Sequence, residues 1–289
     1  MAGNRGRSDS EKVRLFSPEE RQEVLDRTLT ALRTDSRIAG VVVVGSGAVG
    51  FDDIYSDIDL SVVVASENNT LPVFREWKQR IEELFTVIQC FEVTFAPNNH
   101  LLGFLLDGYL ELDVGFLCLA NLSARRARWK VAFDRSARIE EIMRSSWEKR
   151  TDPDVRADYV RRANSIWHYV IHVAVALERA QPWRALYYLG EIRKRTIELA
   201  GLSRGLDTGD FREVDRLPRE FLAELQRALV SSLDGAEIMR ALKVVTACFF
   251  RESRGLDEML GLDLARRLEP KMQEYLELRE RKKASGNHA

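Results

Sequence analysis

The fold of this chain is decided by residues 41–64, which read VVVVGSGAVGFDDIYSDIDLSVVV. The stretch opens with four β-branched residues, and such a run ended by glycine is typical of a central strand and too short for a buried helix. Gly45 and Ser46 form the turn that follows. Its backbone is free to adopt positive φ and to approach a ligand, and the serine hydroxyl can donate to a phosphate oxygen. Alone, however, such a turn is common and usually has no further role.

The second half of the stretch carries two alternating aspartates. Along residues 56–64, SDIDLSVVV, apolar and polar side chains alternate with the period of a strand that has one face on the core. The carboxylates of Asp57 and Asp59 therefore point the same way, and like charges so placed repel unless a cation lies between them. Hard oxygen ligands beside a turn suited to phosphate indicate Mg²⁺ bound jointly by protein and nucleotide. The alternative is a polar strand face exposed to water.

A second pair of acids lies in residues 110–116, LELDVGF. The alternation puts the apolar residues on one face of a strand and Glu111, Asp113 and Gly115 on the other. The predicted sheet therefore presents another two carboxylates. The alternative is a surface strand with two solvated acids.

The pattern Gly45-Ser46 followed by Asp57-x-Asp59 resembles the signature of the polymerase-β-like nucleotidyltransferase superfamily. The later part of the chain is similar to its aminoglycoside and lincosamide nucleotidyltransferases. The resemblance implies that the Gly-Ser turn binds the triphosphate, that the two aspartates hold metal ions, and that a later strand supplies a third carboxylate. The implied cofactor is Mg²⁺, as two ions, with an NTP, most plainly ATP, as co-substrate.

Within this resemblance, Asp113 is the expected third metal ligand and proton acceptor, because an aspartate flanked by apolar residues on a strand matches the pattern better than Glu111. Glu111 is then expected to bind acceptor groups, and which of the two is the base stays open. Ser56, directly before the first acid pair, is expected to bind the nucleotide with Gly45 and Ser46.

The order of predicted elements gives an α+β fold: a mixed sheet flanked by helices, then an all-α helical bundle. Ser17-Pro18-Glu19-Glu20 predicts a helix start with a capping box. The expected domains are residues 1–135, the nucleotidyltransferase domain with disordered residues 1–12, and residues 136–289, the bundle. Long helical periodicity is expected over residues 154–180, 183–200, 218–230, 236–251 and 262–278.

One bundle helix could contribute to the site. Residues 182–193, PWRALYYLGEIR, resemble the helical domain of the aminoglycoside and lincosamide enzymes, which helps to wall their cleft. Arg193 is the expected contact to the nucleotide phosphates, since a guanidinium suits them. A solvated basic helix end is the alternative.

Composition excludes several classes of protein. The chain has 289 residues, 45% of them hydrophobic, and a net charge of −1, so it is globular and lacks the basic field of a nucleic-acid binder. No apolar run is long enough for a membrane span, and residues 1–12 contain no signal peptide, so we expect a cytoplasmic protein. A homodimer is left open.

The expected function is a Mg²⁺-dependent nucleotidyltransferase that moves a nucleoside monophosphate from an NTP to a hydroxyl of a small molecule and releases pyrophosphate. An aminoglycoside or lincosamide antibiotic is the acceptor that the resemblance suggests. Two alternatives stay open: modification of a protein or tRNA, and a nucleotide-binding, antitoxin-like regulatory module without robust turnover.

Overall fold

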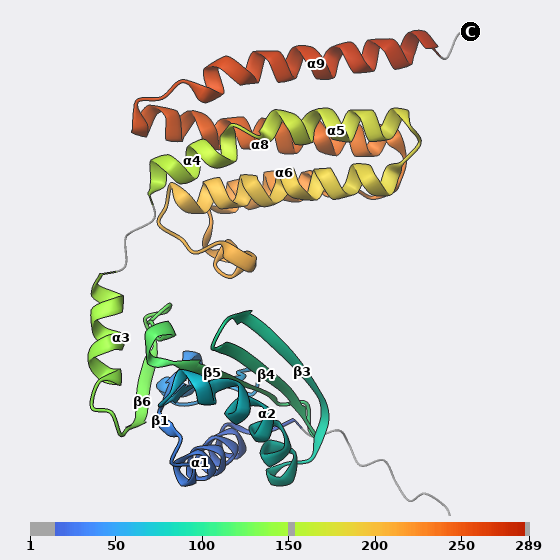
Figure 1. The fold of residues 1–289 in the computed structure, drawn as a ribbon. Coiled ribbons are helices and arrows are strands. Elements are labelled where there is room, and N and C mark those ends of the chain that lie inside the picture. The colour runs from blue at the N-terminus through green and yellow to red at the C-terminus, as the bar shows by residue number, and fades with distance from the viewer. Residues whose placement is uncertain (1–14, 150–153, 287–289) are drawn as a thin grey trace, which may run out of the picture. The chain divides into compact units, whose positions relative to one another are not determined.

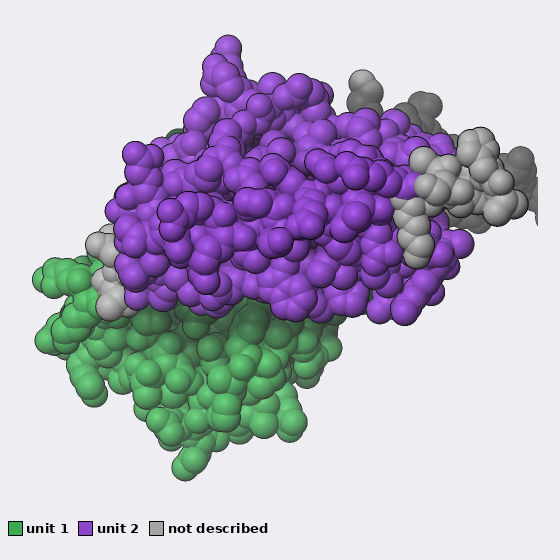
Figure 2. Space-filling view, turned by 90° about the horizontal axis from the view of Figure 1, so that it is seen from above, with its two compact units in different colours: residues 1–150 green, residues 151–289 purple. Residues whose placement is uncertain are grey.

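The structure is a computed structural model that describes residues 15–149 and 154–286. The chain forms two compact units, Met1–Arg150 and Thr151–Ala289, coloured separately in Figure 2. The boundary thus lies at Arg150 rather than at the expected residue 135. Helix α3 (Ile139–Glu148) belongs to the first unit because its Ile139 and Met143 are buried against the sheet. The expectation of disorder over residues 1–12 lies outside the described residues.

The first unit is built on a mixed sheet, as the sequence predicts, and the sheet has six strands. Its strands lie in the order β3-β4-β5-β2-β1-β6. Their bounds are β1 (Ile38–Val44), β2 (Ile58–Val64), β3 (Val87–Ala96), β4 (Asn99–Leu106), β5 (Glu111–Cys118) and β6 (Trp129–Asp134). Strands β2 and β5 pair in parallel, and the other neighbours are antiparallel.

Helices α1 (Pro18–Thr34) and α2 (Glu67–Leu84) cover one face of the sheet (Figure 1). The predicted capping box begins α1: the Ser17 hydroxyl accepts from the Glu20 backbone N–H, and the Glu20 carboxylate accepts from that of Ser17. Leu32 and Trp77 are fully buried in the core between these helices and the strands.

On the opposite face, residues 15–149 cover the sheet at one end only. There Val63 and Leu117 of the sheet pack against Ile139 and Met143 of α3 and against Leu122. The same face of β2 and β5 carries polar or small residues nearer the start of each strand, where the burial pattern alternates between buried and half-buried. This arrangement leaves part of the sheet open for a site.

The second unit is a helical bundle, also as predicted (Figure 1). Its helices are α4 (Val155–Ala163), α5 (Ile166–Glu178), α6 (Pro182–Leu202), α7 (Arg219–Arg227), α8 (Gly235–Leu260) and α9 (Leu264–Gly286). The single helix expected over residues 154–180 is interrupted at Asn164 and Ser165, whose side chains compete with helical backbone hydrogen bonds. Within the described ranges, no helix combines the length and apolar character needed to cross a bilayer.

The bundle contains a buried polar contact that we expect to govern its stability. Tyr159 of α4 is fully buried, and its hydroxyl donates to Asp257 Oδ1 of α8 at 2.7 Å. The other oxygen of that carboxylate accepts from the Ala265 backbone N–H in α9. Tyr159→Phe should therefore lower the free energy of unfolding by about 1–3 kcal/mol, because it removes one partner of a buried carboxylate. Urea denaturation measures the loss. The control is Tyr187→Phe: Tyr187 is 64% exposed, so this variant should change the free energy of unfolding by less than about 0.5 kcal/mol.

Candidate active site

Two carboxylates lie side by side on the open face of the sheet. Asp59 of β2 and Asp113 of β5 are direct partners in the parallel ladder. Both are half-buried between buried apolar neighbours, which is the alternation that the sequence predicts. Asp57, expected on the same strand, lies immediately before β2 and is exposed.

Asp113 is in an unfavourable place for a negative charge. Burial, the negative charge of Glu111 and those of Asp59 and Asp57, in that order, raise the pKa of its carboxyl to about 7. One oxygen, Oδ1, is buried and has no hydrogen-bond partner among the residues that the structure describes. A buried carboxylate oxygen without a partner costs free energy, so this position suits a cation.

The residues therefore fit a hard divalent cation. Carboxylate oxygens are the ligands that Mg²⁺ prefers, and Asp59 and Asp113 offer them from adjacent strands. Across residues 15–149 and 154–286, no three His, Cys, Asp or Glu side chains stand close enough together to form a ready-made metal site. The assignment of Asp57, Asp59 and Asp113 as metal ligands thus stays a prediction.

The glycine turn lies directly against this acid pair. Residues Gly45–Ala48 form a short 3-10 helix, and Gly45 has φ of +71°. A Cβ atom at Gly45 would lie 3.1 Å from Asp59 Oδ2, so only glycine combines this backbone conformation with so close an approach. Ser46, half-buried, follows it in the turn. The turn is thus placed to present backbone and hydroxyl groups to a ligand that also meets Asp59, and nucleotide binding by Gly45 and Ser46 remains a prediction.

Ser56, also expected to bind the nucleotide, has a structural partner. Its hydroxyl donates to Asp53 Oδ1 at 3.0 Å, and its backbone N–H donates to the same oxygen. These bonds close the loop that leads into Asp57. The role of Ser56 toward a nucleotide stays a prediction.

A buried arginine that the sequence analysis missed also holds this loop. Arg21 of α1 is 3% exposed and donates from Nε to the Ser56 carbonyl at 2.8 Å. Its other nitrogens donate to the carbonyls of Ile54 and Phe16. Because each of the three guanidinium nitrogens donates to a backbone carbonyl, two of them in the loop, Arg21 holds the loop before Asp57 against α1.

We expect Arg21→Lys to lower the rate constant of the reaction proposed below by about tenfold, because a lysine cannot reach the acceptors in the same geometry and the loop loosens. The KM for nucleotide should rise in parallel. Steady-state kinetics measure both, and Arg33→Lys on the exposed side of α1 is the matched control. Unchanged kinetics in Arg21→Lys would show that the loop keeps its place without the clamp.

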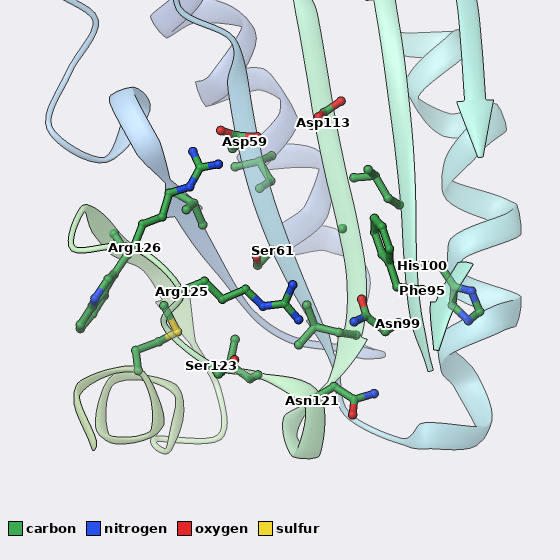
Figure 3. A pocket seen from close by; sticks show the side chains of 18 residues that line it. Asp59, Ser61, Phe95, Asn99, His100, Asp113, Asn121, Ser123, Arg125 and Arg126 are labelled. Carbon is green, nitrogen blue, oxygen red and sulfur yellow. The ribbon is translucent and has the colours of Figure 1, made fainter. Parts of the chain in front are cut away.

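A pocket of about 340 Å³ extends from the acid pair along the sheet. Figure 3 shows Asp59 and Asp113 close together at one end, with the Arg126 side chain reaching toward Asp59 and Arg125 extending across the middle. Ser61 of β2 also lines it. Other polar lining residues, which the sequence analysis did not single out, are Asn99, Asn121 and Ser123.

The remaining site residues expected from the sequence lie elsewhere. Glu111 is exposed at the start of β5 and does not line the pocket, although its charge acts on Asp113. Arg193 is half-buried in α6 of the second unit. Both assignments, acceptor binding by Glu111 and phosphate binding by Arg193, stay predictions.

Comparison with known proteins gives structural likenesses only. Neither a family model nor a curated protein sequence matches the chain. Among solved structures, it is similar to an aminoglycoside 6-adenyltransferase from Bacillus subtilis, with 16% identity and a TM-score of 0.43 over 90% of this chain and 98% of that one. It is also similar to a nucleotidyltransferase-like protein from Exiguobacterium sibiricum 255-15, with 11% identity and a TM-score of 0.39 over 81% and 77% of the two chains.

Proposed function

We propose that this protein is a Mg²⁺-dependent nucleotidyltransferase, which transfers a nucleoside monophosphate from an NTP, with ATP as the first candidate, to a hydroxyl of a small molecule. The observation that carries the proposal is the pair Asp59 and Asp113, adjacent in a parallel ladder, with a buried oxygen of Asp113 lacking a partner. A cation there would supply the partner that Asp113 Oδ1 lacks, and a turn suited to phosphate lies against Asp59.

In the proposed reaction the acceptor oxygen forms a bond to the α-phosphorus of the NTP. The bond from that phosphorus to the bridging oxygen breaks, and pyrophosphate leaves with the electron pair. When bound, Mg²⁺ would lower the pKa of the acceptor hydroxyl and offset the charge on the phosphates.

The residues of the chain have three tasks in this reaction. Asp57, Asp59 and Asp113 would hold the metal ions. A carboxylate oxygen of Asp113 is also the proposed acceptor of the hydroxyl proton. Gly45 and Ser46 hold the triphosphate so that the acceptor attacks in line with the leaving group.

The test is direct. Purified full-length protein is incubated with each α-labelled NTP, Mg²⁺ and a panel of hydroxyl compounds that includes aminoglycosides and lincosamides, and labelled product and pyrophosphate are measured. Binding of each NTP is measured separately by calorimetry with Mg²⁺ and with EDTA. We expect Mg²⁺-dependent binding of at least one NTP and its transfer to one compound class. If no NTP binds in a Mg²⁺-dependent manner, the proposal is wrong.

A further inference from the structure

The charges along the pocket are arranged in two groups. Four lining residues are aspartates or arginines: Asp59 and Asp113 lie at one end, Arg126 reaches toward Asp59, and Arg125 extends across the middle. If Mg²⁺ neutralises the two carboxylates, the charged groups left to interact with a substrate are the two guanidinium groups. The middle of the pocket, which Arg125 crosses, is then positive.

The two guanidinium groups are available to a ligand. Arg125 and Arg126 are exposed side chains in the segment between β5 and β6, and neither makes a hydrogen bond, ion pair or ring contact with any residue of the described ranges. Most other arginines near the sheet form ion pairs or hydrogen bonds: Arg37, for example, pairs with Asp35 and Glu76. Unpaired guanidinium groups lining a cavity are suited to bind phosphate or carboxylate.

The segment that carries the arginines is fixed in place. The Gly45 backbone N–H donates to the Arg128 carbonyl at 3.1 Å, which joins the segment to the glycine turn. At its other end the Asn121 amide donates to the carbonyls of Pro97 and Asn98, and the Ala124 N–H donates to the Ser146 hydroxyl at 2.9 Å. The backbone that carries the two arginines is therefore held by hydrogen bonds on both sides. Less backbone freedom is lost when a ligand binds, which lowers the entropy cost of binding.

The pocket and the turn expected to hold the triphosphate meet at Asp59, but they are made of different residues. Gly45 and Ser46 do not line the pocket, whereas Ser61, Gly115 and Leu117, farther along β2 and β5, do. A ligand in the pocket thus contacts residues farther along β2 and β5 and leaves Gly45 and Ser46 to the triphosphate. Both substrates could then meet at the acid pair, as an in-line attack requires.

We infer that the pocket binds an acceptor that carries an anionic group, a phosphate or a carboxylate, and that Arg125, supported by Arg126, recognises this group. The inference rests on the proposed function and narrows its acceptor class. A polycationic acceptor would meet two guanidinium groups at short range, and like charges disfavour such binding. Ser61, Asn99 and Ser123 offer neutral hydrogen-bonding groups to the rest of the molecule.

The test uses inorganic phosphate as the probe of the anion site and a Mg²⁺ complex of α,β-methylene-ATP as the probe of the nucleotide site. Calorimetry measures how tightly the full-length protein binds each probe, first alone and then in the presence of the other probe. Arg125→Gln should weaken phosphate binding about tenfold or more, because it removes charged hydrogen bonds, and should leave nucleotide binding within about twofold. Arg128→Gln is the matched control: the same segment, the same charge change and an exposed side chain that does not line the pocket.

The inference is supported if phosphate and nucleotide bind at the same time and Arg125→Gln weakens the binding of phosphate only. Mutually exclusive binding, with both probes weakened by Arg125→Gln, would mean that the arginines serve the nucleotide phosphates, and the acceptor assignment would be wrong. Absence of saturable phosphate binding below about 10 mM would also overturn it. Failure of the proposed function has a different signature: the nucleotide does not bind with Mg²⁺, while phosphate still binds in an Arg125-dependent manner.

Discussion

Asp113→Asn should lower the rate of nucleotidyl transfer by about 1,000-fold, because it removes both a metal ligand and the proton acceptor of the proposed reaction. The fold should be retained, since asparagine has nearly the same shape. Glu111→Gln is the matched control on the same strand: it makes the same change of charge at an exposed position, and we expect it mainly to raise the KM for the acceptor. Reversed kinetic effects would make Glu111 the catalytic group.

The same variant should be more stable than the wild type at high pH. The pKa of Asp113 is raised from 3.8 to about 7 on folding, so the folded protein binds this proton more tightly than the unfolded chain. The stabilisation from that proton is complete below about pH 4 and is lost as the pH rises through about 7. Without Mg²⁺, Asp113→Asn should therefore raise the free energy of unfolding by about 2 kcal/mol at pH 8 and by little at pH 4. Denaturation at both values, in EDTA, measures the difference.

Asp59→Asn should abolish Mg²⁺-dependent nucleotide binding and lower transfer by about 1,000-fold or more, because the proposed metal site loses one of its carboxylates. Calorimetry with α,β-methylene-ATP separates the binding loss from the catalytic loss. The control is Asp52→Asn, an exposed aspartate that does not line the pocket, which should bind nucleotide as the wild type does. Normal Mg²⁺-dependent binding in Asp59→Asn would contradict its role as a ligand.

The sequence predicts the central part of the fold well because the local signals there are strong. The β-branched run at Val41, the alternation around Asp59 and Asp113, and the capping box at Ser17 each specify one conformation, and the structure has all three. The mixed sheet and the helical bundle follow from the order of such elements.

The parts that sequence reasoning missed depend on distant partners. Strand β6 shows alternation over Trp129, Val131 and Phe133, but its place at the edge beside β1 is set by tertiary pairing. The Arg21 clamp joins residues far apart in sequence, and no local pattern reveals it. Arg125 and Arg126 are visible as a basic cluster, yet only the folded chain brings that cluster to the pocket.

The parallel pairing of β2 with β5 has a consequence for the order in which the chain acquires its site. Asp59 and Asp113 meet only after residues 65–110 have formed the crossover through α2, β3 and β4. Contacts between such distant segments form late, because the closure of a long loop costs entropy first. A growing chain that ends before β5 carries half of the acid pair, and Arg125 and Arg126 are synthesised later still. Nucleotide binding would therefore begin only when the first unit is nearly complete, which would make it a marker for the final stage of folding.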